Sequence, residues 1–324
     1  MLDQWLVPGA ERVANGPLAD SPPGPPMSPP KPAGARTRIT PAGLMFLAIT
    51  AIGWGLTWPV NKFLLGELPP LTLRGGTALV GAIILALFSL LRRQSLAVPG
   101  PMWPRVLLVA LSNVGAWMTL TAFSLLYLPA SEAVLIAYTF PVWTVILAWP
   151  VLGERPTLLR LVALIMALAG LAAILGGNDL SASREKLPGM IMALAAAIGF
   201  ALGSVLVKKW PIHMPPIPAA GWQLAIGGLP LLAIGLLIET THLASVSATG
   251  WWLLVYSTVG QFCIAYVSWF AALARLPASV AAIGVTAAPV IGVATSALTL
   301  GEPLGPGQIA ALVFTLAGVA LATR

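Results

Sequence analysis

Ten apolar runs of about 18 to 24 residues follow one another from Pro41 to the end of the 324-residue chain. A helix of this length crosses the hydrocarbon core of a bilayer, because it rises about 1.5 Å per residue. The predicted spans are 42–65, 70–91, 105–126, 129–151, 157–176, 187–207, 217–238, 251–273, 277–300 and 306–323. The connections are too short to hold a soluble catalytic domain. We therefore predict an all-α integral membrane protein with ten transmembrane helices.

The amino-acid composition excludes the soluble classes of protein. Hydrophobic residues make up 58% of the chain and charged residues 8%, whereas soluble domains carry roughly a quarter charged residues. The formal net charge is +7, but the basic residues stand singly or in pairs, so no nucleic-acid partner is expected. Cys263 is the single cysteine, which rules out an internal disulfide or a cysteine metal cluster.

The basic residues predict the orientation of the chain in the membrane. With the N-terminus inside, the inner side collects thirteen Lys and Arg residues, the outer side has three, and Arg74 lies within a span. The inner set is Arg12, Lys31, Arg36, Arg38, Arg92, Arg93, Arg105, Arg155, Arg160, Lys208, Lys209, Arg275 and Arg324, and the outer set is Lys62, Arg184 and Lys186. Because cytoplasmic loops carry the excess of basic residues, both termini are expected in the cytoplasm. The expected location is the bacterial inner membrane.

Residues 1–40 differ in composition from the rest of the chain. They hold nine of the 30 prolines, and such a segment cannot build a packed core. We expect a disordered Pro-rich tail. A ligand for a partner domain, a dispensable tail and a start codon misassigned upstream of Met27 or Met45 remain open alternatives.

The second half of the chain repeats the first. Residues 128–174 align with 276–322 without a gap at an offset of 148, and 17 of the 47 aligned positions are identical. Leu152-Gly153-Glu154, for example, reappears as Leu300-Gly301-Glu302. The predicted repeats, 41–176 and 187–323, each hold five helices, and an odd number inverts the second repeat in the membrane. Inverted repeats are typical of secondary transporters that work by alternating access around a site between the halves.

Particular residues of these repeats resemble a known family. They are Gly53-Trp54-Gly55, Pro69-Pro70 followed by Arg74, and the doubled Pro…Leu-Gly-Glu pattern that ends at Glu154 and Glu302. The pattern resembles the EamA-type, ten-helix members of the drug/metabolite transporter superfamily, over about residues 42–323, and is most similar to the amino-acid exporter branch. The resemblance implies a pseudo-symmetric bundle in which helices 1–4 and 6–9 surround a central cavity, with helices 5 and 10 outside.

Polar and aromatic side chains that share helical faces form the candidate substrate site. In the first span Trp54, Trp58 and Asn61 follow the i, i+4, i+7 spacing of one face. The full candidate set is Trp54, Trp58, Asn61, Asn113, Trp117, Tyr138, Ser204, Gln261, Tyr266 and Thr286. Interhelical hydrogen bonding is the alternative explanation for each polar member. Aromatic walls with a few amide and hydroxyl groups suit a small amphipathic solute.

Four further residues are candidates for gating or coupling. Pro141 and Pro289 are matched by the repeat near mid-span, where each should kink its helix; static packing is the alternative. Arg74 and Glu132 lie well inside spans, where ionisable residues are costly. They could pair with each other, Glu132 could couple protons, or both could extend to the interface.

Other charged and small residues have simpler interpretations. Glu154 and Glu302 follow glycines at helix ends and suit the start of the next helix. Lys62, at a helix end, is expected to extend towards the interface. Small residues on the fifth and tenth spans, among them Gly170 and Gly318, favour close packing of these helices within the chain.

The predicted function is export of small metabolites, with amino acids as the leading substrates. Efflux of lipophilic cations is the main alternative, but 42–60 lacks the glutamate that small multidrug relatives carry in their first helix. An enzyme is not expected, because His213 and His242 are isolated and no metal-ligand spacing is present. A channel is poorly supported without a ring of charges. We expect no cofactor and no metal; the expected partners are a small-molecule substrate and the lipid bilayer, with the chain a monomer or weak homodimer.

Overall fold

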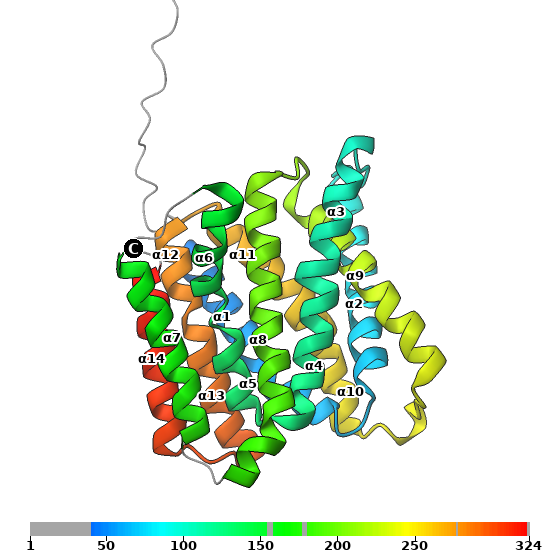
Figure 1. The fold of residues 1–324 in the computed structure, drawn as a ribbon. Coiled ribbons are helices and arrows are strands. Elements are labelled where there is room, and N and C mark those ends of the chain that lie inside the picture. Colours follow the sequence, from blue (N-terminus) through cyan, green and yellow to red (C-terminus); the bar gives the residue numbers. More distant parts are fainter. Residues whose placement is uncertain (1–39, 154–157, 177–179, 277, 323–324) are drawn as a thin grey trace, which may run out of the picture. The chain divides into compact units, whose positions relative to one another are not determined.

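The computed structural model describes residues 40–153, 158–176, 180–276 and 278–322, and every regular element within them is a helix (Figure 1). The helices of the first half are α1 (Pro41–Leu64), α2 (Pro70–Leu91), η1 (Gly100–Met102), α3 (Trp103–Val109), η2 (Ala110–Ala116), α4 (Trp117–Tyr127), α5 (Ala130–Ala137), α6 (Phe140–Leu152) and α7 (Leu158–Gly176). Those of the second half are α8 (Leu180–Lys209), α9 (Pro216–Ile238), η3 (Leu243–Ser245), α10 (Ala248–Val255), η4 (Tyr256–Ile264), α11 (Ala265–Leu273), α12 (Ala278–Val285), α13 (Ala287–Leu300) and α14 (Pro306–Ala322). The predicted Pro-rich tail and Glu154 lie outside the described residues.

Seven helical segments of the described residues are long and apolar enough to cross a membrane. They are Pro41–Leu64, Pro70–Leu91, Gly100–Tyr127, Ala130–Leu152, Arg184–Lys209, Pro216–Ile238 and Ala248–Leu273, and two shorter apolar helices are Ala287–Leu300 and Pro306–Leu321. Large apolar side chains point outward, as Leu237 and Leu298 show with 84% exposure each. A soluble protein would bury such side chains. The chain is therefore an integral membrane protein.

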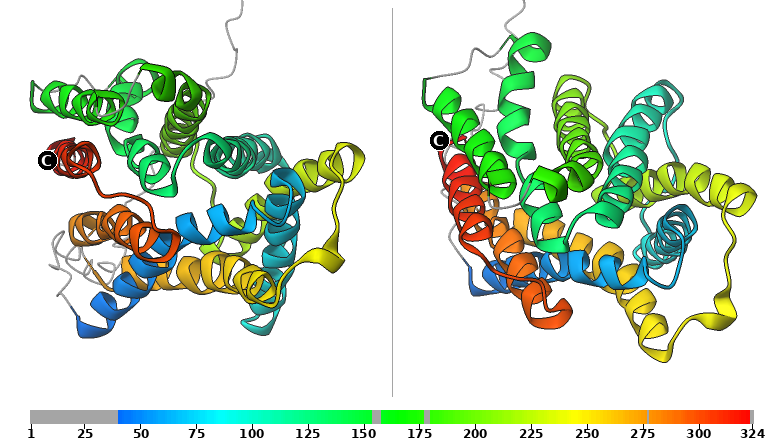
Figure 2. Two further views of the ribbon diagram at one scale, coloured as in Figure 1. Left: turned by 90° about the horizontal axis from the view of Figure 1, so that it is seen from below. Right: turned by 60° about the horizontal axis from the view of Figure 1, so that its bottom comes forward.

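Helices α7 and α14 lie side by side at one edge of the bundle, and both also contact α6 (Figures 1 and 2). A side chain at Gly170 would meet Ala311 and Thr315 of α14, so the small residue permits close approach of the two backbones. The prediction that these helices pack on each other within the chain is confirmed. Helix α14 also reaches towards the interior, because Thr315 is 2% exposed.

Two helices are interrupted at matching places in the two halves. Helix α5 ends at Ala137 and α12 ends at Val285, and each end lies four residues before a proline, Pro141 or Pro289. A proline ring clashes with the carbonyl four residues earlier and supplies no N–H to it. The predicted kinks are therefore present, and they separate α5 from α6 and α12 from α13.

A second matching irregularity is a pair of π-helical segments. η2 separates α3 from α4 in the first half, and η4 separates α10 from α11 in the second. A π-helical turn takes one more residue than an α-helical turn and changes the direction in which the following side chains point. Nothing in the apolar pattern predicted these segments.

Glutamates cap helix N-termini at the end of the bundle where α2, α5 and α10 begin, which we call the capped end. Glu239 accepts hydrogen bonds from the backbone N–H groups of Leu71 and Thr72 at 2.9 and 2.8 Å. Glu67 accepts from the Ser247 backbone N–H at 3.2 Å and from its hydroxyl at 2.6 Å, beside the start of α10. Each carboxylate satisfies donors that a helix start leaves unpaired.

Glu302 forms a third cap, and it joins the two halves of the chain. Its two carboxylate oxygens accept from the N–H groups of Ala130 and Ser131 at 2.6 and 2.8 Å. The prediction that Glu302 caps a helix is confirmed, but the prediction that it caps the next helix in sequence is wrong. The carboxylate stabilises the start of α5 rather than the start of α14, because α13 ends beside α5 at the capped end.

Candidate functional site

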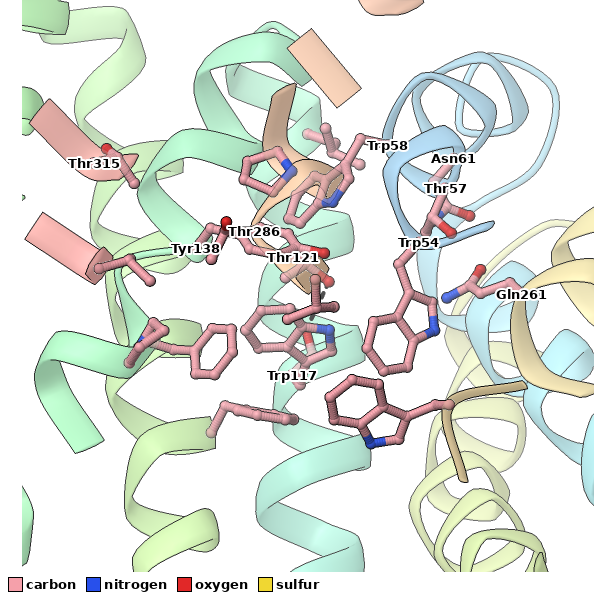
Figure 3. A pocket seen from close by; sticks show the side chains of 18 of the residues that line it. Trp54, Thr57, Trp58, Asn61, Trp117, Thr121, Tyr138, Gln261, Thr286 and Thr315 are labelled. Atoms are coloured by element: carbon pink, nitrogen blue, oxygen red, sulfur yellow. Dashed lines mark hydrogen bonds between the residues drawn. The ribbon is translucent and has the colours of Figure 1, made fainter. Parts of the chain in front are cut away.

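A cavity of about 390 Å³ lies among helices of both halves (Figure 3). The predicted residues that line it are Trp54, Trp58, Asn61, Arg74, Trp117, Tyr138, Pro141, Gln261, Tyr266, Thr286 and Pro289. Both helix interruptions open onto this space, since Tyr138 and Pro141 border it from one half and Thr286 and Pro289 from the other. The volume lies within the range of small-molecule sites, roughly 300 to 1,000 Å³.

One wall of the cavity is a cluster of aromatic rings around Trp117. The ring centroid of Trp117 is 4.9 Å from that of Phe200, 6.3 Å from Phe140 and 6.5 Å from Trp58. Tyr138 extends the cluster at 6.4 Å from Trp58. Edge-to-face and tilted contacts of this kind stabilise the cluster by about 0.5–1.5 kcal/mol for each pair of rings.

A second aromatic group lines the cavity from α1 and α11. Trp54 contacts Tyr266 and Trp269, each with a centroid separation of 5.6 Å. Sequence reasoning missed Phe140, Phe200 and Trp269. Two of them could have been found by helical spacing, because Phe200 stands four residues before Ser204 and Trp269 three residues after Tyr266.

The glycines that flank Trp54 explain how α1 presents this ring. A side chain at Gly53 would lie 2.9 Å from Ala265 of α11, and one at Gly55 would lie 2.8 Å from Ala288 and Ile291 of α13. Helix α1 therefore packs closely between α11 and α13, two helices of the second half. The Gly-Trp-Gly sequence allows this close approach on both sides and leaves the indole at the cavity.

The polar side of the cavity holds two amide side chains, Asn61 and Gln261, and both contact the buried hydroxyl of Ser257. The Ser257 hydroxyl oxygen lies 3.4 Å from Oδ1 of Asn61 and 3.3 Å from Oε1 of Gln261. A hydroxyl has one proton, so it donates to one of these oxygens at a time. Figure 3 shows Asn61 and Gln261 on the same side of the cavity as Trp54, with Tyr138 on the opposite side. The amide oxygens can therefore serve a ligand that brings N–H donors.

Among the described residues that line the cavity, Arg74 carries the charge. Its side chain is 3% exposed, and its Nε and Nη1 have no hydrogen-bond partner within the described residues. The guanidinium carbon lies 6.0 Å from the centroid of the Phe262 ring. A buried guanidinium with unused donors is costly unless an acceptor arrives.

Glu132 is not among the residues that line the cavity, and its partners are Lys186 and Gln308. Its Oε1 accepts from Nζ of Lys186 at 2.8 Å and from Nε2 of Gln308 at 3.1 Å. The carboxylate is 1% exposed and connects α5 with α8 and α14. The alternative in which Arg74 and Glu132 pair with each other is therefore wrong, because the carboxylate already has Lys186 as its partner.

Two members of the predicted set, Asn113 and Ser204, are not among the residues that line the cavity. A side chain at Gly203 would overlap the carboxamide of Asn113, so this amide packs against α8. The Ser204 hydroxyl donates to the carbonyl of Phe200 at 2.8 Å, within its own helix. Asn113 lies in η2, where the π-helical turn changes the side-chain directions relative to those of a regular helix.

Lys62 also differs from its prediction. Its ammonium donates to the carbonyl of Leu128 at 2.9 Å and to the carbonyl of Leu125, where α4 ends. These are carbonyls of the last turn, which a cation stabilises. The side chain thus fastens α1 to α4 instead of extending to the interface. Within the described part of the chain, no group of three His, Cys, Asp or Glu residues is placed to hold a metal ion.

Comparison with known proteins agrees with this architecture. The EamA-like transporter family matches residues 41–176 and again 187–324. The chain is 29% identical to the "Uncharacterized transporter YvbV" of Bacillus subtilis, over 86% of this chain and 90% of that protein. It is also 29% identical to the "Probable amino-acid metabolite efflux pump" of Salmonella typhimurium, over 85% and 92% of the two chains.

A solved crystal structure shares the fold, with a TM-score of 0.63 at 23% identity, over 87% of this chain and 96% of that one. The two family matches together span nearly all the described residues. The names of the relatives are those of transporters and efflux pumps, not of enzymes. The chain belongs to the EamA-like transporter family, within the drug/metabolite transporter superfamily, and is a multi-pass membrane transporter.

Proposed function

We propose that this protein exports small metabolites, with aromatic or hydrophobic amino acids as substrates, across the bacterial inner membrane. The observation that carries the proposal is the cavity, which both halves line with aromatic rings and a few polar groups. A site of this kind suits a solute with an apolar body and a polar end. The relatives named "Probable amino-acid metabolite efflux pump" in Salmonella typhimurium and Escherichia coli support the same substrate class.

The proposed topology has ten crossings, with the repeats 41–176 and 187–323 inverted and both termini cytoplasmic. The excess of basic residues at one side supports this orientation. The capped end, with Glu67, Glu239 and Glu302, would then face outward. We take the unit to be a monomer or weak homodimer.

Alternating access would use the interruptions before Pro141 and Pro289. Helix α5 is held at its start by Glu302 and in its first turn by the Glu132–Lys186 pair. The interruption lets α6 change its angle while α5 stays in place. The same division separates α12 from α13, so each half carries one hinge beside the substrate.

The second candidate, efflux of lipophilic cations, fits the aromatic walls, because cations bind to ring faces. The presence of Arg74 in the cavity argues against a cationic substrate. A buried positive charge in the cavity repels a cationic substrate in a medium of low dielectric.

A counterflow assay tests the proposal. Purified protein in proteoliposomes is given labelled amino acids, nucleosides and quaternary amines, each against an internal pool of the same compound. We expect uptake of phenylalanine and tryptophan with mutual competition. Uptake of quaternary amines alone would contradict the proposal and favour cation efflux.

A further inference from the structure

Arg74 has a binding capacity that the protein itself leaves unused. Its guanidinium is 3% exposed and borders the cavity, and two of its three nitrogens have no acceptor within the described residues. The cost of burying such a charge falls when an anion binds to it. An unpartnered guanidinium at a cavity therefore points to an anionic group on the solute.

The residues that face Arg74 supply no such anion. The described residues that line the cavity include no aspartate or glutamate. Glu132, the other ionisable residue predicted to matter inside a span, is bound to Lys186 and Gln308. Phe262 offers a ring at 6.0 Å, the limit of a cation–π contact, and a ring face accepts no conventional hydrogen bond.

We propose that Arg74 binds the carboxylate of the transported solute through paired N–H···O hydrogen bonds. The planar fork of a guanidinium matches the two oxygens of a carboxylate. This inference rests on the proposed function and narrows its substrate class to compounds with a free carboxylate. The role of Arg74 is then substrate recognition instead of pairing with a second charge across a gate.

The rest of the cavity fits the remainder of an amino acid. The amide oxygens of Asn61 and Gln261 share one hydroxyl proton, so one of them can accept from an ammonium group. The aromatic cluster around Trp117 can contact an apolar side chain. Carboxylate, ammonium and apolar body thus each have a complementary group in the same cavity.

The test compares phenylalanine with two close analogues in wild-type and variant proteoliposomes. 3-Phenylpropionate keeps the carboxylate without the ammonium, and phenylalaninamide keeps the ammonium without the carboxylate. In the wild type, unlabelled 3-phenylpropionate should compete with labelled phenylalanine, and the amide should compete about tenfold less well or worse. Arg74→Gln should remove phenylalanine uptake, and Arg74→Lys should keep part of it, because an ammonium retains the charge without the fork.

Arg92→Gln is the matched control, because Arg92 is an exposed residue just after the same helix. It should transport as the wild type does. Thermal unfolding of Arg74→Gln, with and without phenylalanine, shows whether the substitution affects binding of the solute or folding of the protein. Arg74→Gln should unfold at the wild-type temperature or higher without solute, since it loses an unpaired buried charge, and phenylalanine should no longer stabilise it.

The results distinguish this inference from the function on which it rests. If wild-type protein transports phenylalanine and Arg74→Gln transports it equally well, the carboxylate assignment is wrong while the function stands. Equal competition by phenylalaninamide has the same meaning. If the wild type transports no amino acid, the proposed function fails. Thermal unfolding then tests the assignment of the carboxylate to Arg74. The assignment holds if 3-phenylpropionate stabilises the wild type but not Arg74→Gln, and it is wrong if both proteins respond alike.

Discussion

Nζ of Lys186 lies 2.8 Å from Oε1 of Glu132, and this contact ties α8 of the second half to α5 of the first. The carboxylate is 1% exposed and the lysine side chain 19%. Neither Glu132 nor Lys186 is among the residues that line the cavity. It fixes the part of the broken helix that lies before Tyr138, and we therefore interpret it as structural.

Glu132→Gln should lower the stability of the protein while leaving transport dependent on pH as before. The amide can still bond to Gln308 but leaves the Lys186 charge without its partner, at a cost of about 1–3 kcal/mol. Thermal unfolding in detergent measures the first effect and counterflow at several pH values the second. Loss of the pH dependence in this variant would instead make Glu132 the proton-coupling group.

Glu302→Ala should destabilise the junction between the halves by about 1–2 kcal/mol, because two N–H groups at the start of α5 lose their acceptor. Glu302→Gln keeps one carbonyl oxygen and should lose less. Glu185→Ala is the control, since Glu185 is exposed on α8. Equal unfolding temperatures for Glu302→Ala and Glu185→Ala would show that the cap adds no stability.

Gly55→Ala and Gly76→Ala form a matched pair with opposite expected signs. A methyl group at Gly55 would meet Ala288 and Ile291 at 2.8 Å, so overpacking should cost about 1–3 kcal/mol. At Gly76 nothing lies within 4 Å, and alanine should stabilise α2 by up to about 1 kcal/mol. Chemical unfolding of both variants gives the comparison. A stabilised Gly55→Ala would contradict the close approach of α1 to α13.

Pro141→Ala and Pro289→Ala test the hinges. Restoring the backbone N–H favours a continuous helix through each interruption, so turnover should fall several-fold while the KM for substrate changes little. Pro230→Ala is the control, because Pro230 lies inside α9 and does not line the cavity. Unchanged turnover in both hinge variants would mean that the interruptions serve packing alone.

Local features of the sequence predicted much of this architecture. The run 70–91 coincides with α2, and Pro141 and Pro289 marked the two interruptions, because apolar length and a missing N–H act on the helix that contains them. Aromatic residues on one helical face, such as Trp54 and Trp58, do line the cavity.

The errors came from interactions that act over long separations or change helix geometry. The partner of Glu302 lies 171 residues away in sequence, so helix capping rules could identify the role but not the helix. The direction of the Asn113 side chain could not be predicted, because the sequence carries no clear signal for the π-helical turn in η2. The distance in sequence from Glu132 to Lys186 likewise hid this ion pair, which none of the alternatives considered for Glu132 included.

The most direct test of the account is phenylalanine counterflow by wild-type, Trp117→Ala and Trp252→Ala proteins in proteoliposomes. Trp117 contacts three aromatic rings at the cavity, whereas Trp252 is 75% exposed on α10. The account predicts that the wild type and Trp252→Ala transport phenylalanine, and that Trp117→Ala inserts normally but loses uptake by about tenfold or more. Equal uptake by both tryptophan variants would contradict the assignment of this cavity as the substrate site.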